Sequence, residues 1–158
     1  MIMGTRDHHS RVTVRWTGNL GSGTAGYGAY SRNHEIRGEG KPPIAGSSDP
    51  VFRGDADRYN PEELFVASLA ACHELWFLHL CADAGIVVTA YEDEAEGWMQ
   101  ETADGGGRFV RVRLRPRARI EGVCGAATIG DIHQAAHKKC FLASSVNFPV
   151  EVPPEDLQ

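Results

Sequence analysis

The pattern of apolar and polar residues predicts one long, mostly apolar helix with short strands before and after it. Residues 60–85 (NPEELFVASLAACHELWFLHLCADAG) place apolar side chains around nearly the whole helical circumference. Such a pattern is typical of a helix that is buried on most sides rather than lying on a surface. Asn60 suits the N-cap, Pro61 the first helical position and Gly85 the left-handed end. We therefore expect the chain to be organised around this helix, which carries Cys72 near its middle.

Upstream of the helix, the pattern indicates a hairpin followed by a long loop. Residues 11–16 alternate, with Val12, Val14 and Trp16 on one face, which predicts a half-buried strand. A glycine-rich connection over 18–26 lacks the spacing of a phosphate-binding loop and leads to a second strand within 27–36. Residues 38–59 are rich in Gly, Pro, Ser and Asp and predict a long loop with room for one short strand.

Downstream of the helix, an acidic strand over 86–101 and an alternating strand over 109–120 are expected to pair as a hairpin. The second strand places five arginines on one face: Arg111, Arg113, Arg115, Arg117 and Arg119. We interpret this row as the partner of the acidic strand through cross-strand ion pairs, rather than as a phosphate-binding stripe. A second, shorter helix over 126–141 and a last strand over 144–152, which Pro149 assigns to a sheet edge, complete an α+β order.

Length and composition exclude several classes of protein. A chain of 158 residues, with 42% hydrophobic and 23% charged residues, predicts a single soluble domain over 1–158. The net charge of -5 argues against a general nucleic-acid or anionic-membrane binder. The N-terminal residues lack the apolar core of a signal peptide, and His73, Glu74 and His79 interrupt the central helix. We therefore predict a cytoplasmic protein without a membrane span.

The four cysteines form no CxxC pair, so in the cytosol they are expected to be reduced, reactive or buried rather than a disulfide framework. Cys72 and Cys81 are nine residues apart and therefore on opposite faces of the helix. Nothing in its surroundings marks Cys124. Cys140 follows Lys138 and Lys139, whose charges favour a thiolate, although the C-terminal helix dipole opposes it.

Histidines raise an alternative to cysteine chemistry. His133, His137 and Cys140 stand at i, i+4 and i+7, on one face of the second helix, and could present two nitrogens and a sulfur to zinc. A polar, solvent-facing stripe explains the same spacing, and a fourth ligand is missing. We therefore predict no metal site and keep this face as an alternative site for a metal or another ligand.

Two motifs resemble one known family. NPEELFVASLAAC, with AHKKCFLASSV about 68 residues later, closely resembles the osmotically inducible protein C and organic hydroperoxide resistance (OsmC/Ohr) family. The WTG near the N-terminus and the RGDADRYNPEE before the helix extend the resemblance over most of the chain. It implies an α+β, OsmC-like fold, with curved antiparallel sheets packed on a long central helix and a second shorter helix, in an interlocked homodimer.

The resemblance also implies an activity, the reduction of organic hydroperoxides by paired cysteines. By position, Cys72 is then the peroxidatic cysteine and Cys140 the resolving cysteine, joined in a disulfide during turnover. Glu62 takes the place of the catalytic glutamate, and Arg53 is the best match for the activating arginine, with Arg32 as the alternative. The implied reductant is an external dithiol such as a lipoyl group, and no bound cofactor is expected.

Two positions depart from the family pattern: His73 stands where an aromatic residue is common, and Phe141 where proline often follows the second cysteine. Glu62 also precedes Cys72 by ten residues, about 15 Å along a helix, so the two can meet only if two antiparallel helices build shared sites in a homodimer. Two alternative functions stay open. One is a non-catalytic binding protein that uses His133, His137 and Cys140, and the other is an OsmC-like thiol hydrolase or acyl-transfer enzyme.

Overall fold

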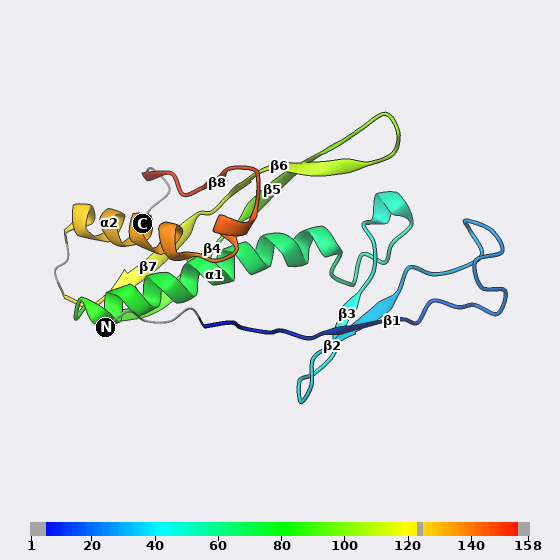
Figure 1. The fold of residues 1–158 in the computed structure, drawn as a ribbon, viewed down its shortest axis with the longest axis horizontal. Helices are drawn as coiled ribbons and strands as arrows, with labels where there is room; N and C mark the ends of the chain where they lie inside the picture. Colours follow the sequence, from blue (N-terminus) through cyan, green and yellow to red (C-terminus); the bar gives the residue numbers. More distant parts are fainter. Residues whose placement is uncertain (1–5, 123–124, 155–158) are drawn as a thin grey trace. The chain divides into compact units, whose positions relative to one another are not determined.

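The predicted long helix is present as α1 (Pro61–Asp83) in the computed structural model, which describes residues 6–122 and 125–154 (Figure 1). The helix ends as predicted, because Gly85 adopts a positive φ of 71° and the Ile86 amide donates to the Cys81 carbonyl at 2.8 Å. The chain divides into two compact units, Met1–Pro61 and Glu62–Gln158, and the prediction of one domain over 1–158 stays a prediction.

The first unit is a three-stranded antiparallel sheet in the order β1-β2-β3, followed by a short 3-10 helix. Its elements are β1 (Thr13–Trp16), β2 (His34–Arg37), β3 (Ile44–Gly46) and η1 (Pro50–Phe52). The predicted hairpin and the one short strand in the following loop are thus confirmed, although β2 is shorter than expected. The Trp16 indole donates to the Ser31 carbonyl at 2.8 Å and closes the long connection between β1 and β2.

The predicted burial of one face of β1 is wrong for this chain. Val12 and Val14 are 66% and 62% exposed, and all four residues of β1 are exposed. The alternation of the sequence determined which side chains share a face, but a three-stranded sheet alone supplies no second layer that could cover that face. The apolar face of β1 is therefore not covered within the first unit.

The second unit combines two sheets with two helices. Its elements after α1 are β4 (Val88–Asp93), β5 (Glu96–Glu101), β6 (Gly107–Arg113), β7 (Pro116–Ile120), α2 (Ala126–Lys139), η2 (Ala143–Ser145) and β8 (Val150–Glu151). Strands β4 and β7 pair antiparallel, as do β5 and β6, and β8 joins β6 in parallel at the edge that Pro149 predicted. The Val112 amide donates to the Pro149 carbonyl at 3.0 Å, so the proline joins the ladder as an acceptor.

The prediction of two long strands over 86–101 and 109–120 is wrong in one respect, because each region splits into two strands that belong to different sheets. At the break, the Arg115 amide donates to the Asp93 carboxylate at 2.7 Å instead of to a carbonyl of the ladder. The predicted cross-strand ion pairs are confirmed at Arg117, which reaches Glu92 at 3.2 Å and Glu94 at 2.7 Å. The arginine row is thus partly neutralised by its acidic neighbours.

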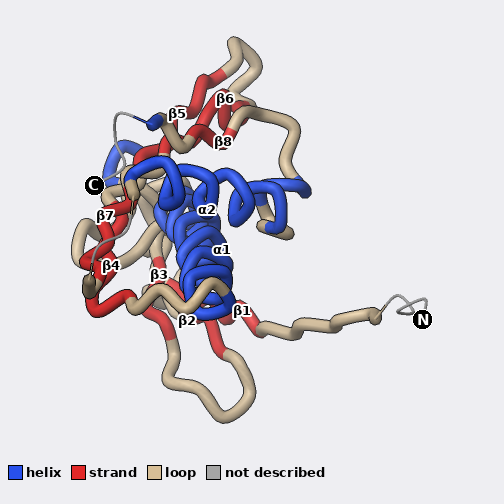
Figure 2. Tube along the Cα trace, turned by 90° about the vertical axis from the view of Figure 1, so that its left-hand side faces the viewer, coloured by secondary structure: helices blue, strands red, loops and turns tan. Residues whose placement is uncertain are grey.

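Helix α1 supplies the core of the second unit through a stripe of every fourth residue: Leu69, His73, Phe77 and Cys81. Leu69 packs with Val112, Leu114 and Val150 from the β6 region and β8. Phe77 and Cys81 pack against Ile132 and Ala136 of α2, and the two helices lie next to each other in Figures 1 and 2.

The second unit by itself does not bury α1 on most sides. A second stripe, Ala67, Ala71 and Leu75, is exposed, and Leu75 is 67% exposed. Among the described residues, α1 is also the one helix long and apolar enough to cross a membrane by length and composition, a test that core helices of soluble proteins pass as well.

Candidate active site

The structure brings Cys72 and Cys140 together from positions 68 residues apart in the chain. Cys72 lies in the middle of α1, and Cys140 is the residue that caps the C-terminus of α2. Their Sγ atoms are 2.7 Å apart, and both thiols are free. Since the two sulfur atoms are already in contact, they can react with each other without any rearrangement of the helices.

The two thiols differ in exposure, and burial changes the pKa of Cys140. Cys140 is 1% exposed, whereas Cys72 is half-buried and accessible to a solute. Burial, and then the hydrogen bond to Cys72, raise the pKa of the Cys140 thiol to about 11, although the Ala143 amide, which donates to its sulfur at 3.3 Å, opposes the shift. Cys140 therefore keeps its proton near neutral pH and donates it to the sulfur of Cys72.

The expectation that Lys138 and Lys139 favour a thiolate at Cys140 is wrong, because the pKa of that thiol is raised. The Lys139 ammonium lies over the Trp76 ring, 5.3 Å from its centroid, and Lys138 lines a cavity beside α2. Burial of the sulfur outweighs the effect of two lysines whose charges are directed elsewhere.

An apolar rim surrounds the sulfur pair. Leu75 and Trp76 follow Cys72 by three and four residues, on the same side of α1. Phe141 follows Cys140, is 66% exposed, and meets the Trp76 ring edge-to-face at 5.9 Å. A hollow of about 220 Å³ lies against Leu75, Trp76 and His79. The surface next to Cys72 is therefore suited to an apolar solute.

Behind Cys72 lies a buried pair of histidines that the sequence analysis did not anticipate. The Nε2 of His73 and the Nδ1 of His133 are 2.9 Å apart, and the planes of the two rings are nearly parallel, with an angle of 3° between them. Burial, and then the neighbouring His133 and His137, lower the pKa of His73 to about 3, and burial lowers the pKa of His133 to about 4. Both imidazoles are therefore neutral near pH 7, and one donates to the other. The only sequence signal for this pair was the unusual histidine after Cys72.

The predicted polar face of the second helix is not solvent-facing, since His133 and Cys140 are 2% and 1% exposed. Cys140 contacts Cys72, and His133 contacts His73, so these side chains do not converge on one point. No group of three or more potential metal ligands occurs in the described part of the chain.

Glu62 and Cys72 lie on one uninterrupted helix, with Glu62 half-buried in its first turn. The prediction that each site is shared between two chains depends on this continuity, because a continuous helix keeps Glu62 away from the Cys72 of its own chain. Cys81 lies in the core of the second unit, opposite to Cys72, as its spacing predicted. Cys124 lies outside the described residues.

The two candidate arginines, Arg53 and Arg32, belong to the first unit and share one aromatic neighbour. Arg32 donates to the carbonyls of Tyr30 and Tyr27, both at 2.7 Å, and stacks on both rings at 4.2 and 4.3 Å. Arg53 follows η1 with its guanidinium 6.0 Å from the Tyr27 ring centroid. It is the only described non-glycine residue with positive φ, 63°. Backbone strain of this kind concentrates at functional positions, and of the two candidate arginines only Arg53 carries it.

Comparisons with known proteins agree with this architecture. The family model described as OsmC-like protein matches residues 54–155, more than half of the chain. An OsmC-like protein of unknown function from Vibrio cholerae is 28% identical with a TM-score of 0.82, over 93% of this chain and 100% of that one. No curated protein matches.

Two organic hydroperoxide resistance proteins have the same fold at lower identity. The protein from Elizabethkingia anophelis is 19% identical, with a TM-score of 0.66, over 95% of this chain and 100% of that one. OhrB of Bacillus subtilis is 21% identical, with a TM-score of 0.65, over 96% and 98%. With the family match over residues 54–155 and this α+β fold, the chain belongs to the OsmC-like family.

Proposed function

We propose that this protein is a thiol-dependent peroxidase that reduces organic hydroperoxides to alcohols. The observation that carries the proposal is the contact between an accessible Cys72 and a buried Cys140, with their sulfurs 2.7 Å apart. A peroxidase with two cysteines needs one thiol that the peroxide can reach and a second one close enough to form a disulfide with it.

The reaction balances with one peroxide and one dithiol. The Cys72 thiolate attacks one peroxide oxygen, the O–O bond breaks, and the alkoxide leaves as an alcohol after taking up a proton, so that Cys72 becomes a sulfenic acid. The Cys140 sulfur then attacks the Cys72 sulfur, water leaves, and a Cys72–Cys140 disulfide forms. An external dithiol, such as a lipoyl group, reduces this disulfide by exchange and becomes a disulfide itself.

The surroundings of the sulfur pair support an organic peroxide rather than hydrogen peroxide as the substrate. Leu75, Trp76 and Phe141 form an apolar rim beside Cys72, and burial of an apolar group there contributes roughly 25 cal/mol per Å². Hydrogen peroxide has no apolar group to bury. The reducing cytoplasm, which keeps thiols available for such a cycle, is the compartment that fits this chemistry.

Activation of Cys72 is assigned to Arg53, with Glu62 as the carboxylate that compensates the charge of the arginine. Cys72 is in mid-helix, so the helix N-terminus gives its thiolate no help. Along the continuous α1, ten residues correspond to about 15 Å between Glu62 and Cys72. We therefore propose a homodimer in which Glu62 and Arg53 of one copy serve the Cys72 of the other.

The exposed apolar surface supports this dimer. The stripe Ala67, Ala71 and Leu75 of α1 is not covered within the second unit, and Val12 and Val14 are not covered within the first unit. Small residues on α1 allow a second helix to approach closely, and a cluster of exposed apolar side chains is typical of a surface that another protein copy covers.

A turnover assay tests the proposed function. Purified protein is mixed with dihydrolipoamide and either cumene hydroperoxide or hydrogen peroxide, and peroxide loss is followed. We expect faster turnover with cumene hydroperoxide, complete loss of activity in Cys72→Ser, and largely retained activity in Cys81→Ser and Cys124→Ser. Turnover by Cys72→Ser, or a dead Cys81→Ser that is still folded, would contradict the assignment. Thioester hydrolysis in place of peroxide loss would favour the hydrolase alternative, and stoichiometric zinc would favour the binding protein.

A further inference from the structure

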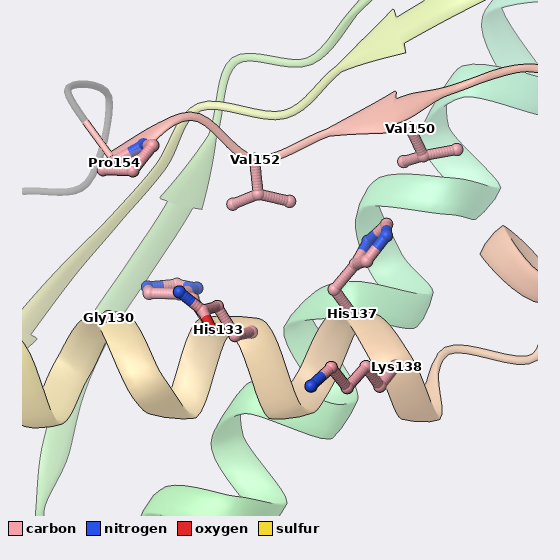
Figure 3. A pocket seen from close by; sticks show the side chains of 8 residues that line it. Gly130, His133, His137, Lys138, Val150, Val152 and Pro154 are labelled. Atoms are coloured by element: carbon pink, nitrogen blue, oxygen red, sulfur yellow. The ribbon is translucent and has the colours of Figure 1, made fainter.

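A cavity outside the sulfur pair lies between α2 and the segment around β8, as Figure 3 shows. Its volume is about 240 Å³. The residues that line it are Gly130, His133, Gln134, His137, Lys138, Val150, Val152 and Pro154. Neither Cys72 nor Cys140 belongs to this lining, so the peroxidase chemistry leaves the cavity unused.

The cavity has an apolar wall and a polar wall. Val150, Val152 and Pro154 form the apolar wall, and the side chains of His133 and His137 extend from α2 towards it (Figure 3). A ligand that fits has an apolar body against the valines and a polar head against the imidazoles. At about 240 Å³ the cavity is smaller than a site for drug-sized molecules, so the ligand is small.

The polar wall contains a buried hydrogen-bonding atom that lacks a partner among the described residues. The Nδ1 of His137 is buried and has no hydrogen-bond partner among the described residues. His133 is 2% exposed and uses its Nδ1 on His73, which leaves Nε2 as its other polar atom. Buried polar atoms are normally satisfied, and an unsatisfied one calls for a partner such as a ligand atom.

The charge of the residues that line the cavity favours a ligand of negative charge. Lys138 is a cation, and none of the described residues that line the cavity is acidic. The imidazoles of His133 and His137 can each donate an N–H, as can the Gln134 amide, so the wall can surround an acceptor with donors. A metal cation fits less well, because only two imidazoles face the cavity and the Lys138 charge repels it.

From this arrangement we propose that the cavity binds a small organic monocarboxylate, with its carboxylate at His137 and Lys138 and its alkyl chain against Val150 and Val152. This site differs from the metal face considered from the sequence, since Cys140 takes no part in it. The proposal does not depend on the peroxidase activity.

Hexanoate is a suitable probe, and its binding is measured by calorimetry and by NMR shifts of the histidine rings. We expect saturable binding with a Kd below about 10 mM that weakens as salt rises. Lys138→Gln should weaken binding at least about fivefold, because it removes the fixed positive charge that the described lining places beside the carboxylate. Hexylamine, which has the same chain and the opposite charge, should not bind at this site.

Lys139→Gln is the matched control, since Lys139 carries the same charge one residue away but lies over Trp76. It should bind hexanoate as the parent protein does. Gly130→Leu provides a second variant that removes binding by filling space. A Cβ at Gly130 meets no atom within 4 Å, and leucine is a better helix former than glycine, so this variant should fold.

The proposal would be overturned by no saturable hexanoate binding, by equal loss in Lys138→Gln and Lys139→Gln, or by unchanged binding in a folded Gly130→Leu variant. Equal loss in the two lysine variants would mean that hexanoate responds to the general surface charge. Binding of hexylamine with equal affinity would overturn the anionic assignment. None of these measurements involves peroxide, so their failure would leave the proposed function standing.

Discussion

Glu62 and Cys72 provide the sharpest test of the proposed two-chain site. If Glu62 of one copy serves the Cys72 of another, Glu62→Ala and Cys72→Ser each inactivate every site in their own homodimers. A mixed dimer, however, contains one site that combines an intact Glu62 with an intact Cys72, and one site that lacks both. Two inactive proteins should therefore regain activity when their chains are mixed.

The size of the recovery follows from the continuity of α1, which separates the two residues by about 15 Å within one chain. Random refolding of equal amounts gives about half heterodimers, and each heterodimer has one intact site out of two. About one quarter of all sites are then intact, so the mixture should regain about 25% of the parent activity per chain. A site built within one chain predicts no recovery at any mixing ratio.

The assay unfolds both variants together in denaturant, refolds them by dilution, and measures the reduction of cumene hydroperoxide with dihydrolipoamide. Different affinity tags on the two chains allow heterodimers to be isolated and counted. As a control, each variant is unfolded and refolded alone and should stay inactive. Isolated heterodimers without activity would refute the shared site and return Glu62 to a structural role in the first turn of α1.

Three further predictions follow from the geometry around the cysteines. Cys140→Ser should consume one equivalent of organic peroxide and then stop, because the variant has no second sulfur beside Cys72. Continued turnover of this variant with dithiol would contradict the resolving role of Cys140. So would mass spectrometry of the oxidised parent protein that shows a disulfide between other cysteines. In the parent protein, the rate of disulfide formation after a single oxidation should rise with pH towards the pKa of Cys140, about 11, because only the Cys140 thiolate attacks. A thiol of raised pKa is mostly protonated between about pH 6 and 9, so a rate that does not change over this range would refute the prediction. The neutral His73–His133 pair should make the protein acid-sensitive: both folded pKa values are below the unfolded value, so stability is present above about pH 6.5 and lost as pH falls towards 4, by up to about 2 kcal/mol per histidine at pH 5. Denaturant unfolding at several pH values should show a shallower acid loss for His73→Phe, and parallel curves for the two proteins would contradict the linkage.

The buried histidine pair also bears on why this chain differs from the family pattern. An aromatic residue after the first cysteine would be apolar and need no partner, whereas His73 requires one when buried. His133 supplies it from α2, and the Phe77 ring stacks on His133 at 4.1 Å. The departure at His73 is thus accommodated by a second polar residue 60 positions away.

The sequence by itself determined the features that depend on neighbouring residues. The start of α1 at Pro61 and its end before Gly85 follow from capping chemistry within a few residues. The alternation of residues 11–16 and the acidic and basic strands were visible for the same reason, because strand periodicity is local. The spacing between NPEE and Cys72, together with the second cysteine motif, was sufficient to identify the family.

Only the tertiary structure decided which distant side chains meet. The contact between Cys72 and Cys140 spans 68 residues, and the contact between His73 and His133 spans 60, so no local period encodes either of them. The split of each predicted long strand into two depends on the Arg115 amide and the Asp93 carboxylate, 22 residues apart. The exposed face of β1 is a second example of what local periodicity cannot determine. Periodicity tells which side chains share a face, but whether that face is buried depends on what the rest of the fold, or a second copy of the chain, places against it.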